Sequence, residues 1–260
     1  MWISRYICLF MIYSFMGWVF ECVYCVIKEG RWENRGFLFG PACPIYGTGA
    51  VAISVLDGRV QSLGFTLQAW QIFLIAVLGS AILEYLTSWT LEKLFHAIWW
   101  DYSNLPLNLH GRISFFTSMG FGAAGILIVY VIAPYTENVM SRLTPIGAEF
   151  LALCAISIFV ADLTLTVTLL LHFDRLVIRM EDTFNKNMDA LVKTTVEKSN
   201  TIKQGITARQ KAMYDRLNTM NRFVRATVGR IHTFRYTDQD KAETTNGWLS
   251  LIKKYKKEKR

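Results

Sequence analysis

The chain has 260 residues, of which 52% are apolar and only 18% are charged, and this composition excludes an ordinary soluble domain. Residues 1–173 hold 8 Lys and Arg against 10 Asp and Glu, a net charge of −2, whereas residues 174–260 hold 20 against 10, a net charge of +10. We therefore predict a transmembrane domain over residues 1–173 and a basic cytoplasmic helical tail over residues 174–260.

Five apolar runs follow one another in the first part, at residues 7–27, 41–56, 69–91, 113–133 and 146–173. A transmembrane helix needs about 20 predominantly apolar residues, which every run but the second provides. The second run is short and contains Pro44, Gly47 and Gly49, so whether it crosses fully stays open. The fold class predicted is all-α: a polytopic helical membrane protein with about five transmembrane helices and a C-terminal cytoplasmic helical or coiled-coil tail.

The distribution of Lys and Arg between the connecting segments predicts the orientation of these helices. The segments after the first and third runs carry five of them, and the strongly basic tail falls on the same side of the membrane. The opposite side carries only Arg5, Arg59 and Arg142. We therefore expect the N-terminus outside the cell and the C-terminus in the cytoplasm.

Two polar, aromatic-rich segments between the apolar runs have the residues of folded loops that dock back onto the helices. The candidate residues of these two motif loops are Asn34, Arg35, Gly36, Gly40, Pro41, Pro44, Tyr46 and Gly47 in the first and His96, Trp99, Trp100, Asp101, Tyr102, Asn108, Gly111 and Arg112 in the second. Because proline is tolerated at the start of a helix, we expect the Gly40–Pro41 step to open the second span. A loop side chain is the expected cap of this helix, and an anion site at its N-terminus is the alternative.

The motif loops and their flanks resemble a known family. Residues 13–18, 34–37, 40–47 (G-P-x-x-P-I-Y-G), 91–96, 99–103 and 108–113 are similar to the ABC-transporter type IV, or CmpB-type, membrane proteins of bacteria. The resemblance covers roughly residues 1–175 and implies a transporter permease in the bacterial cytoplasmic membrane. It does not extend to the tail after Phe173 and gives a fold more firmly than an activity.

Four carboxylates lie within or beside the apolar runs: Glu21, Glu84, Glu92 and Asp162. Ionisable groups inside a span are costly and usually face protein or water. For Glu21 and Glu84 we expect either a structural pairing with Arg35 and Arg112 or a cation or proton site shared between the two spans. Snorkelling to the headgroups is a third possibility for them. For Asp162, a hydrogen-bonding partner on another span is expected.

The aromatic part of the second loop has two interpretations. Trp99, Trp100 and Tyr102 can form an interfacial belt in the headgroups or a surface that contacts a soluble subunit. His96, Asp101 and His110 match no metal-ligand spacing, so no metal or other cofactor is predicted. The sequence contains none of the signatures G-x-x-x-x-G-K-[ST], G-x-S-x-G and H-E-x-x-H, and we therefore expect no enzymatic activity.

The tail has helical periodicity over residues 174–231, with two heptad sets that change frame near Gly205. A coiled coil or a helical hairpin is expected there. The last eight residues carry six positive charges, and Trp248, Leu249, Leu251 and Ile252 precede them, a pattern typical of a segment that touches anionic membrane lipids. A solvated tail is the alternative, and nucleic acid is not favoured because no groove-reading motif is present.

The function expected from these features is a permease-like component that uses a separate nucleotide-binding ATPase subunit and works as a homo- or hetero-oligomer. A membrane scaffold or regulatory protein that assembles partners through its helical tail is the first alternative. A lipid-active membrane enzyme with Glu21, Glu84 or Asp101 as acid or base is the second. Neither the substrate nor the direction of transport can be read from the sequence.

Overall fold

The computed structural model describes residues 2–29, 34–195, 220, 222–236 and 239–258 of the chain. Within these ranges the helices are α1 (Trp2–Glu29), α2 (Pro44–Ser62), α3 (Ala69–Phe95), α4 (Phe115–Leu127), α5 (Ala133–Ser141), α6 (Pro145–Thr195), α8 (Arg222–Val228) and α9 (Gln239–Glu258). A π-helical turn, Ile128–Ile132, joins α4 to α5. The short strands β1 (Ala97–Ile98) and β4 (Thr233–Phe234) pair with each other, as do β2 (Asn108–Leu109) and β3 (Ile113–Ser114).

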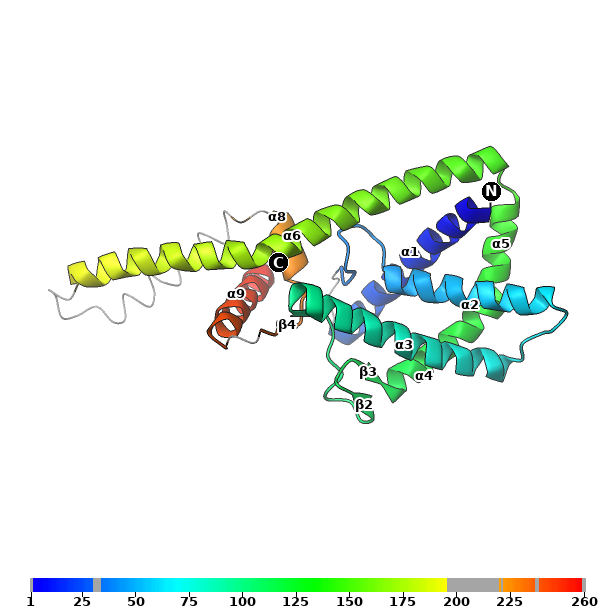
Figure 1. Cartoon of the computed structure of the whole chain (residues 1–260), viewed down its shortest axis with the longest axis horizontal. Helices are drawn as coiled ribbons and strands as arrows, with labels where there is room; N and C mark the ends of the chain where they lie inside the picture. The colour runs from blue at the N-terminus through cyan, green and yellow to red at the C-terminus, as the bar shows by residue number, and fades with distance from the viewer. Residues whose placement is uncertain (1, 30–33, 196–219, 221, 237–238, 259–260) are drawn as a thin grey trace.

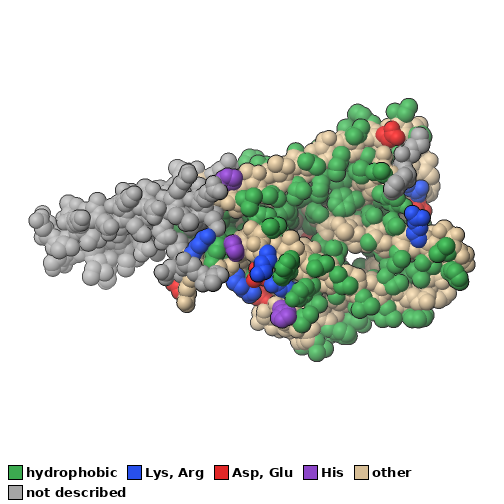
Figure 2. Space-filling model, viewed as in Figure 1, with side chains coloured by type: hydrophobic (Ala, Val, Ile, Leu, Met, Phe, Trp, Pro, Cys, Tyr) green, Lys and Arg blue, Asp and Glu red, His purple; other side chains and the backbone are tan. Residues whose placement is uncertain are grey.

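In the described part of the chain, four segments are long and apolar enough to cross a membrane: Ile3–Lys28, Ala69–Phe95, Phe115–Ser141 and Pro145–Phe173. The 19-residue helix α2 is not one of them by composition, although Figure 1 shows it running alongside α1 and α3. Apolar side chains cover the middle of this helix bundle, and charged side chains gather at its two ends (Figure 2). The predicted all-α membrane fold with about five spans is thereby confirmed.

The two ends of the bundle differ in structure. The start of α1, the α2–α3 turn and the α5–α6 turn lie at one end (Figure 1). The other end, here called the loop end, is formed by residues 34–43, 96–114, 222–236 and 239–258, which contact one another through several hydrogen bonds and the β1–β4 pair. Both motif loops and the C-terminal segment therefore share one side of the molecule, the relation that the charge distribution predicted.

The helices approach closely where glycine removes a side chain from the contact. A Cβ atom built on Gly47 would lie 2.1 Å from the Ser14 hydroxyl oxygen of α1, and one on Gly17 would lie 2.3 Å from the Tyr46 Cβ atom. Such short distances are incompatible with any larger residue, so α1 and α2 pack backbone to backbone, as small residues allow membrane helices to do. This contact places Tyr46 directly against α1.

The start of α2 corrects two expectations. The helix begins at Pro44 and not at the Gly40–Pro41 step, and its N-cap residue, Cys43, gives no side-chain cap bond. The Cys43 N–H donates instead to the Ser14 carbonyl oxygen of α1 at 2.9 Å. Because this bond holds the backbone before Pro44 against α1 in an extended conformation, the first loop continues three residues further than Pro41 suggested.

The C-terminal segment does not form a separate tail in the described residues. Helix α6 continues through the expected boundary at residue 173 as one helix that ends at Thr195. Apolar side chains from the C-terminal segment join the end of α3 and the middle of α6 in one core: Phe95, Ala97, Leu170, Phe173, Met220, Val224, Val228, Ile231, Phe234, Trp248, Leu249 and Ile252. Of the six positions of the predicted second heptad set, Ile206, Met213 and Leu217 lie outside the described residues, and Met220, Val224 and Ile231 belong to this core.

The apolar group before the basic end also differs from expectation. Trp248, Leu249 and Ile252 are only 5%, 3% and 1% exposed, and all three belong to the core at the loop end. They are therefore buried in protein and are not the lipid contact that the sequence indicated. The exposed Lys253 donates to the His232 carbonyl oxygen at 3.1 Å, while the last two residues lie outside the described part.

Candidate functional site

Asp162 holds the first motif loop against the membrane domain. Its two carboxylate oxygens accept hydrogen bonds from the Phe39 N–H at 3.0 Å and the Gly40 N–H at 2.8 Å. The Thr166 hydroxyl, one turn further along α6, donates to the same carboxylate at 3.4 Å. A Cβ atom on Gly40 would lie 2.9 Å from the carboxylate, so glycine permits this close approach. Asp162 thus has a partner on another segment, as the sequence indicated.

Asn34 organises the interior of the same loop. Its side-chain oxygen accepts hydrogen bonds from the Trp18 indole N–H at 2.9 Å and the Gly36 N–H at 3.1 Å, and its amide donates to the Phe39 carbonyl oxygen at 2.9 Å. Arg35 and Pro41 are exposed at the surface of this loop. One short side chain therefore ties the loop both to itself and to α1.

Arg230, which sequence reasoning did not single out, closes the first loop from the C-terminal side. Its guanidinium donates to the Gly36 carbonyl oxygen at 3.0 Å and to the Leu38 carbonyl oxygen, and it lies 5.5 Å from the centre of the Phe39 ring. Residues almost 200 positions apart in sequence are thereby joined. No sequence signal distinguishes Arg230 from the many other basic residues of the tail.

Arg112 and Glu92 form the corresponding link in the second loop. The Arg112 guanidinium lies 2.6 Å from one Glu92 oxygen, Arg235 lies 3.1 Å from the other, and Arg112 also packs 5.4 Å from the centre of the Tyr85 ring. Arg112 therefore compensates a carboxylate on α3, but the expected pairing with Glu84 is wrong. Glu92 lies two turns closer to the loop, where the short connection after Gly111 lets the arginine reach it.

The aromatic residues of the second loop face inward. The Trp99 ring packs 5.4 Å from Phe37 and 6.2 Å from Phe95, between centroids, and joins the two motif loops. The Trp100 indole N–H donates to the Arg112 carbonyl oxygen at 3.0 Å. Both rings thus stabilise the loop itself, and less of their surface is available to contact lipid or a partner.

Asp101 shapes the exposed tip of this loop. Its carboxylate accepts hydrogen bonds from the Ser103 hydroxyl and from the Ser103 N–H, the latter at 2.9 Å, and these two bonds lower the pKa of Asp101. Gly111 has φ +68°, and a Cβ atom there would lie 2.5 Å from the same carboxylate, so only glycine fits. Asn108 accepts from the Gly111 N–H at 3.1 Å and completes the turn.

The histidines of the second loop do not converge with Asp101. His96 ends α3 in the left-handed conformation, with φ 51°, and its ring packs 5.0 Å from Tyr236. The His110 ring nitrogen lies 3.2 Å from the Tyr85 hydroxyl. In the part of the chain that the structure describes, no three His, Cys, Asp or Glu side chains are grouped so as to hold a metal ion.

Glu21 and Glu84 each accept a hydrogen bond from a tyrosine. The Tyr46 hydroxyl donates to Glu21, and the Tyr102 hydroxyl donates to Glu84 at 3.3 Å. Burial raises the pKa of Tyr102, and the negative charges of Glu84 and then Glu21 raise it further. We call Glu21, Tyr46, Glu84 and Tyr102 the carboxylate cluster.

Glu84 is the most enclosed member of this cluster. Its side chain is only 5% exposed, and its Oε2 atom has no hydrogen-bond partner among the described residues. The bonds to Glu21 and Glu84 come from tyrosines and not from the expected Arg35 and Arg112. The sequence identified all four members as candidates, but it did not pair the two carboxylates with the two tyrosines.

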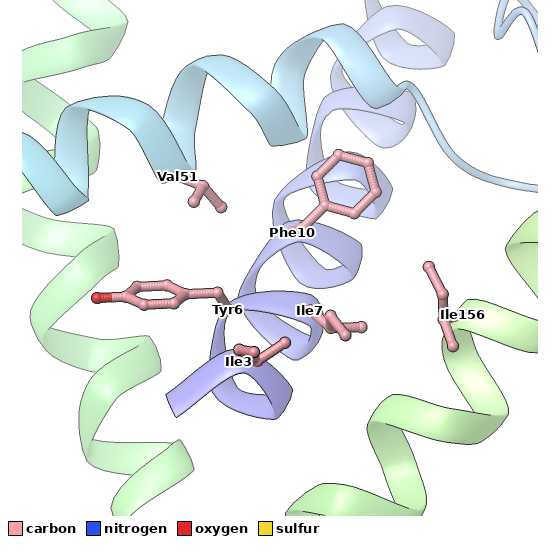
Figure 3. A pocket seen from close by; sticks show the side chains of 6 residues that line it. All are labelled: Ile3, Tyr6, Ile7, Phe10, Val51 and Ile156. Atoms are coloured by element: carbon pink, nitrogen blue, oxygen red, sulfur yellow. The ribbon is translucent and has the colours of Figure 1, made fainter. Parts of the chain in front are cut away.

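One surface cavity is lined by none of these cluster residues. A cavity of about 280 Å³ between α1, α2 and α6 is lined by Ile3, Tyr6, Ile7, Phe10, Val51 and Ile156. Figure 3 shows these side chains, with the Tyr6 hydroxyl directed away from the apolar ones. Its lining is apolar, as expected of a lipid-facing depression, and offers a polar ligand no hydrogen bonds at its centre. The polar functional candidate is therefore the carboxylate cluster and not this cavity.

Comparison with known proteins supports the family resemblance of the motif loops. The family described as "Putative ABC-transporter type IV" matches residues 8–167, more than half of the chain, and the chain therefore belongs to this family. The matched region contains both motif loops, all four intramembrane carboxylates and both tyrosines of the cluster, and it ends before the C-terminal segment. Searches of curated proteins and of solved structures gave no significant match.

Proposed function

We propose that this chain is a permease-like membrane component of an ABC-type transport system and that its ATPase is a separate chain. Its family and its apolar helices support a transporter-type membrane protein. Its 260 residues contain no G-x-x-x-x-G-K-[ST] sequence, so ATP hydrolysis is assigned to another subunit and no enzymatic activity to this chain. About five spans are few for a complete pathway, and several copies or further subunits are therefore part of the proposal.

The folded loop end is the observation that carries this proposal. Asp162 and Arg230 fix the first loop, and Arg112 and Arg235 fix the second through Glu92. A loop that serves only as a connection needs no such bonds. A rigid surface at the end of several spans transmits the movement of a docked subunit to the helices, because packed elements shift as units.

We place the contact with the ATPase on the tip of the second motif loop. Trp99 and Trp100 are turned inward, whereas Asp101 and residues 103–110 are exposed, among them the side chain of Leu107 at 75%. An apolar side chain beside a carboxylate supplies both buried area and an orienting charge-assisted hydrogen bond to a basic partner. The loop end then faces the cytoplasm, with the N-terminus outside, in the bacterial cell membrane.

Purification of the full-length tagged chain from its native host in mild detergent tests the proposal. We expect a P-loop ATPase to copurify and its rate of ATP hydrolysis to change when this chain is added back to it. The double variant D101A/L107A should release the ATPase and still insert into the membrane, whereas Arg59→Ala, at the opposite end, should retain it. A full-length preparation without any ATPase overturns the permease proposal, and retention by the double variant overturns the docking surface.

One observation favours a scaffold as the second candidate. Helix α6 extends 22 residues beyond Phe173, about 33 Å at 1.5 Å per residue, and Figure 1 shows this arm leaving the bundle. A long arm of this kind is suited to holding a partner away from the membrane. Crosslinking distinguishes the candidates: a scaffold is expected to crosslink to its partners from the arm, at residues 174–195, and a permease from the tip of the second loop.

A further inference from the structure

Two cavities adjoin each other at the end of the bundle opposite the loop end. The first, the apolar cavity of about 280 Å³ in Figure 3, lies between α1, α2 and α6. The second, of about 260 Å³, is lined by residues of α1 and α2 and by Glu137 of α5. Tyr6 and Val51 line both cavities. Each volume is slightly below the roughly 300–1,000 Å³ of most small-molecule sites, but two cavities that share a wall reach that range.

The first cavity offers apolar contacts. Its lining side chains come from three helices, and the Tyr6 hydroxyl is directed away from the others (Figure 3). The Phe10 ring of α1 packs against the Phe159 ring of α6, with centroids 5.4 Å apart, so the helices on either side of the cavity are joined. Such a cavity suits an apolar chain, because a polar group buried there would lose its hydrogen bonds to water without gaining others.

The second cavity adds a positive charge. Its lining includes Arg59 and Glu137, but the Glu137 carboxylate already lies 3.1 Å from the Arg5 guanidinium. The Arg59 guanidinium has neither an ion pair nor a hydrogen bond to the described residues. The neighbouring Gly58 also lines this cavity, and a Cβ atom built there would meet nothing within 4 Å. The cavity therefore presents a cation without a counter-charge beside open space.

We propose that the two cavities together bind a single-chain amphiphile with a carboxylate head, a molecule of the fatty-acid class. The carboxylate pairs with Arg59, whose planar guanidinium matches its two oxygens, and the chain passes Tyr6 and Val51 into the apolar cavity. A phosphate head is disfavoured, because its additional charge would face Glu137 in the same wall.

This inference goes beyond the proposed function and does not depend on an ATPase partner. The start of α1 and the end of α2, which form the site, lie at the end of the bundle opposite the loop end (Figure 1). A variant that loses the amphiphile is therefore expected to keep the contact with the ATPase, and the two proposals can fail separately.

Electron paramagnetic resonance of the full-length chain in phosphatidylcholine vesicles tests the site. The probe is stearate with a nitroxide on its chain, and its uncharged methyl ester is the reference. At alkaline pH, where the head of stearate is ionised, the motionally restricted fraction measures the bound probe. We expect the association constant of stearate to be about fivefold higher than that of the ester, the weight of a partly exposed ion pair of about 1 kcal/mol.

Two variants separate the cavity from general surface charge. Arg59→Gln removes the cation, whereas Gly58→Leu keeps the cation and fills the open space beside it. Both should abolish the preference for stearate over its ester. Arg142→Gln, at an exposed arginine of the same end that lines neither cavity, is the matched control and should keep the preference.

Equal association constants for stearate and its ester in the wild-type chain overturn the proposal. An equal loss of preference in Arg59→Gln and Arg142→Gln, or an unchanged preference in Gly58→Leu, also overturns it, because either result assigns the effect to general surface charge. A spin-labelled phosphatidylglycerol that binds more tightly than stearate overturns it in favour of a two-chain phospholipid.

Discussion

Replacing Arg112 with alanine should destabilise the loop end more than replacing Arg235 or Arg59 with alanine. The side chains of Arg112 and Glu92 are 14% and 17% exposed, and their charged atoms are 2.6 Å apart. Removing one partner of such a buried pair costs about 3–5 kcal/mol, because the other charge stays buried. Loss of the contact with the Tyr85 ring adds about 0.5–1 kcal/mol.

Arg235 moderates this cost, since it also contacts Glu92 and remains in the variant. Its own side chain is 61% exposed, so its bond is screened and contributes about 0.2–1 kcal/mol. We therefore expect Arg112→Ala to lower the free energy of unfolding by about 3 kcal/mol and Arg235→Ala by less than about 1 kcal/mol. Arg59→Ala, at the opposite end of the bundle, should change it by no more than about 0.5 kcal/mol.

Folded yield in size-exclusion chromatography and the midpoint of thermal unfolding in detergent measure these effects. The double variant E92Q/R112A removes both charges and should recover part of the loss, because the penalty of Arg112→Ala is largely the unpaired Glu92. Equal yields and midpoints for Arg112→Ala and Arg59→Ala would refute the reasoning. So would a double variant that is less stable than Arg112→Ala.

Three further predictions concern other parts of the molecule. Cysteines introduced at Gly58 and Leu107 should react with an impermeant thiol reagent from opposite sides of the membrane, the first from outside, and labelling of both from one side contradicts the topology. Gly47→Ala would place a methyl group 2.1 Å from a hydroxyl oxygen of α1 and should lower folded yield strongly, whereas Gly58→Ala, with nothing within 4 Å, should not. The hydrogen bonds from Ser103 lower the pKa of Asp101 below its unfolded value of about 3.9. They therefore stabilise the folded state above that pH, and this stabilisation is lost as the pH falls through the folded pKa. Asp101→Asn should make the midpoint of thermal unfolding less sensitive to acid.

The membrane helices were predictable because length and apolar composition determine them locally. The run at residues 69–91 became the helix Ala69–Phe95, and the run at 146–173 lies within Pro145–Thr195. The folded state of the motif loops was also visible, since glycines and short polar side chains have local hydrogen-bonding roles. The sequence did not predict the start of α2 correctly. A backbone hydrogen bond between Cys43 and Ser14 determines this start, and a bond between two backbone groups does not depend on the side chains of either segment.

The partners of the intramembrane carboxylates could be proposed but not assigned from the sequence. Glu21 and Glu84 each had an arginine in the following loop, and charge alone made those pairings reasonable. The structure gives them tyrosines, because Arg112 reaches only Glu92 from its place after Gly111. A side chain's reach depends on the path of the loop, which residue spacing does not specify.

The C-terminal segment shows most clearly what a local reading of the sequence omits. Phe234 lies opposite Ala97 in the β1–β4 pair, and each strand has only two residues, too few for any alternating pattern. The sequence indicated that Trp248 contacts the membrane interface, because a tryptophan before a basic run is typical of such a contact. In the structure it is 5% exposed and packs in the same core as Phe95 and Phe173. The family match ends at residue 167, yet this segment completes the core on which the motif loops rest, so the C-terminal segment stabilises the surface to which we assign the ATPase contact.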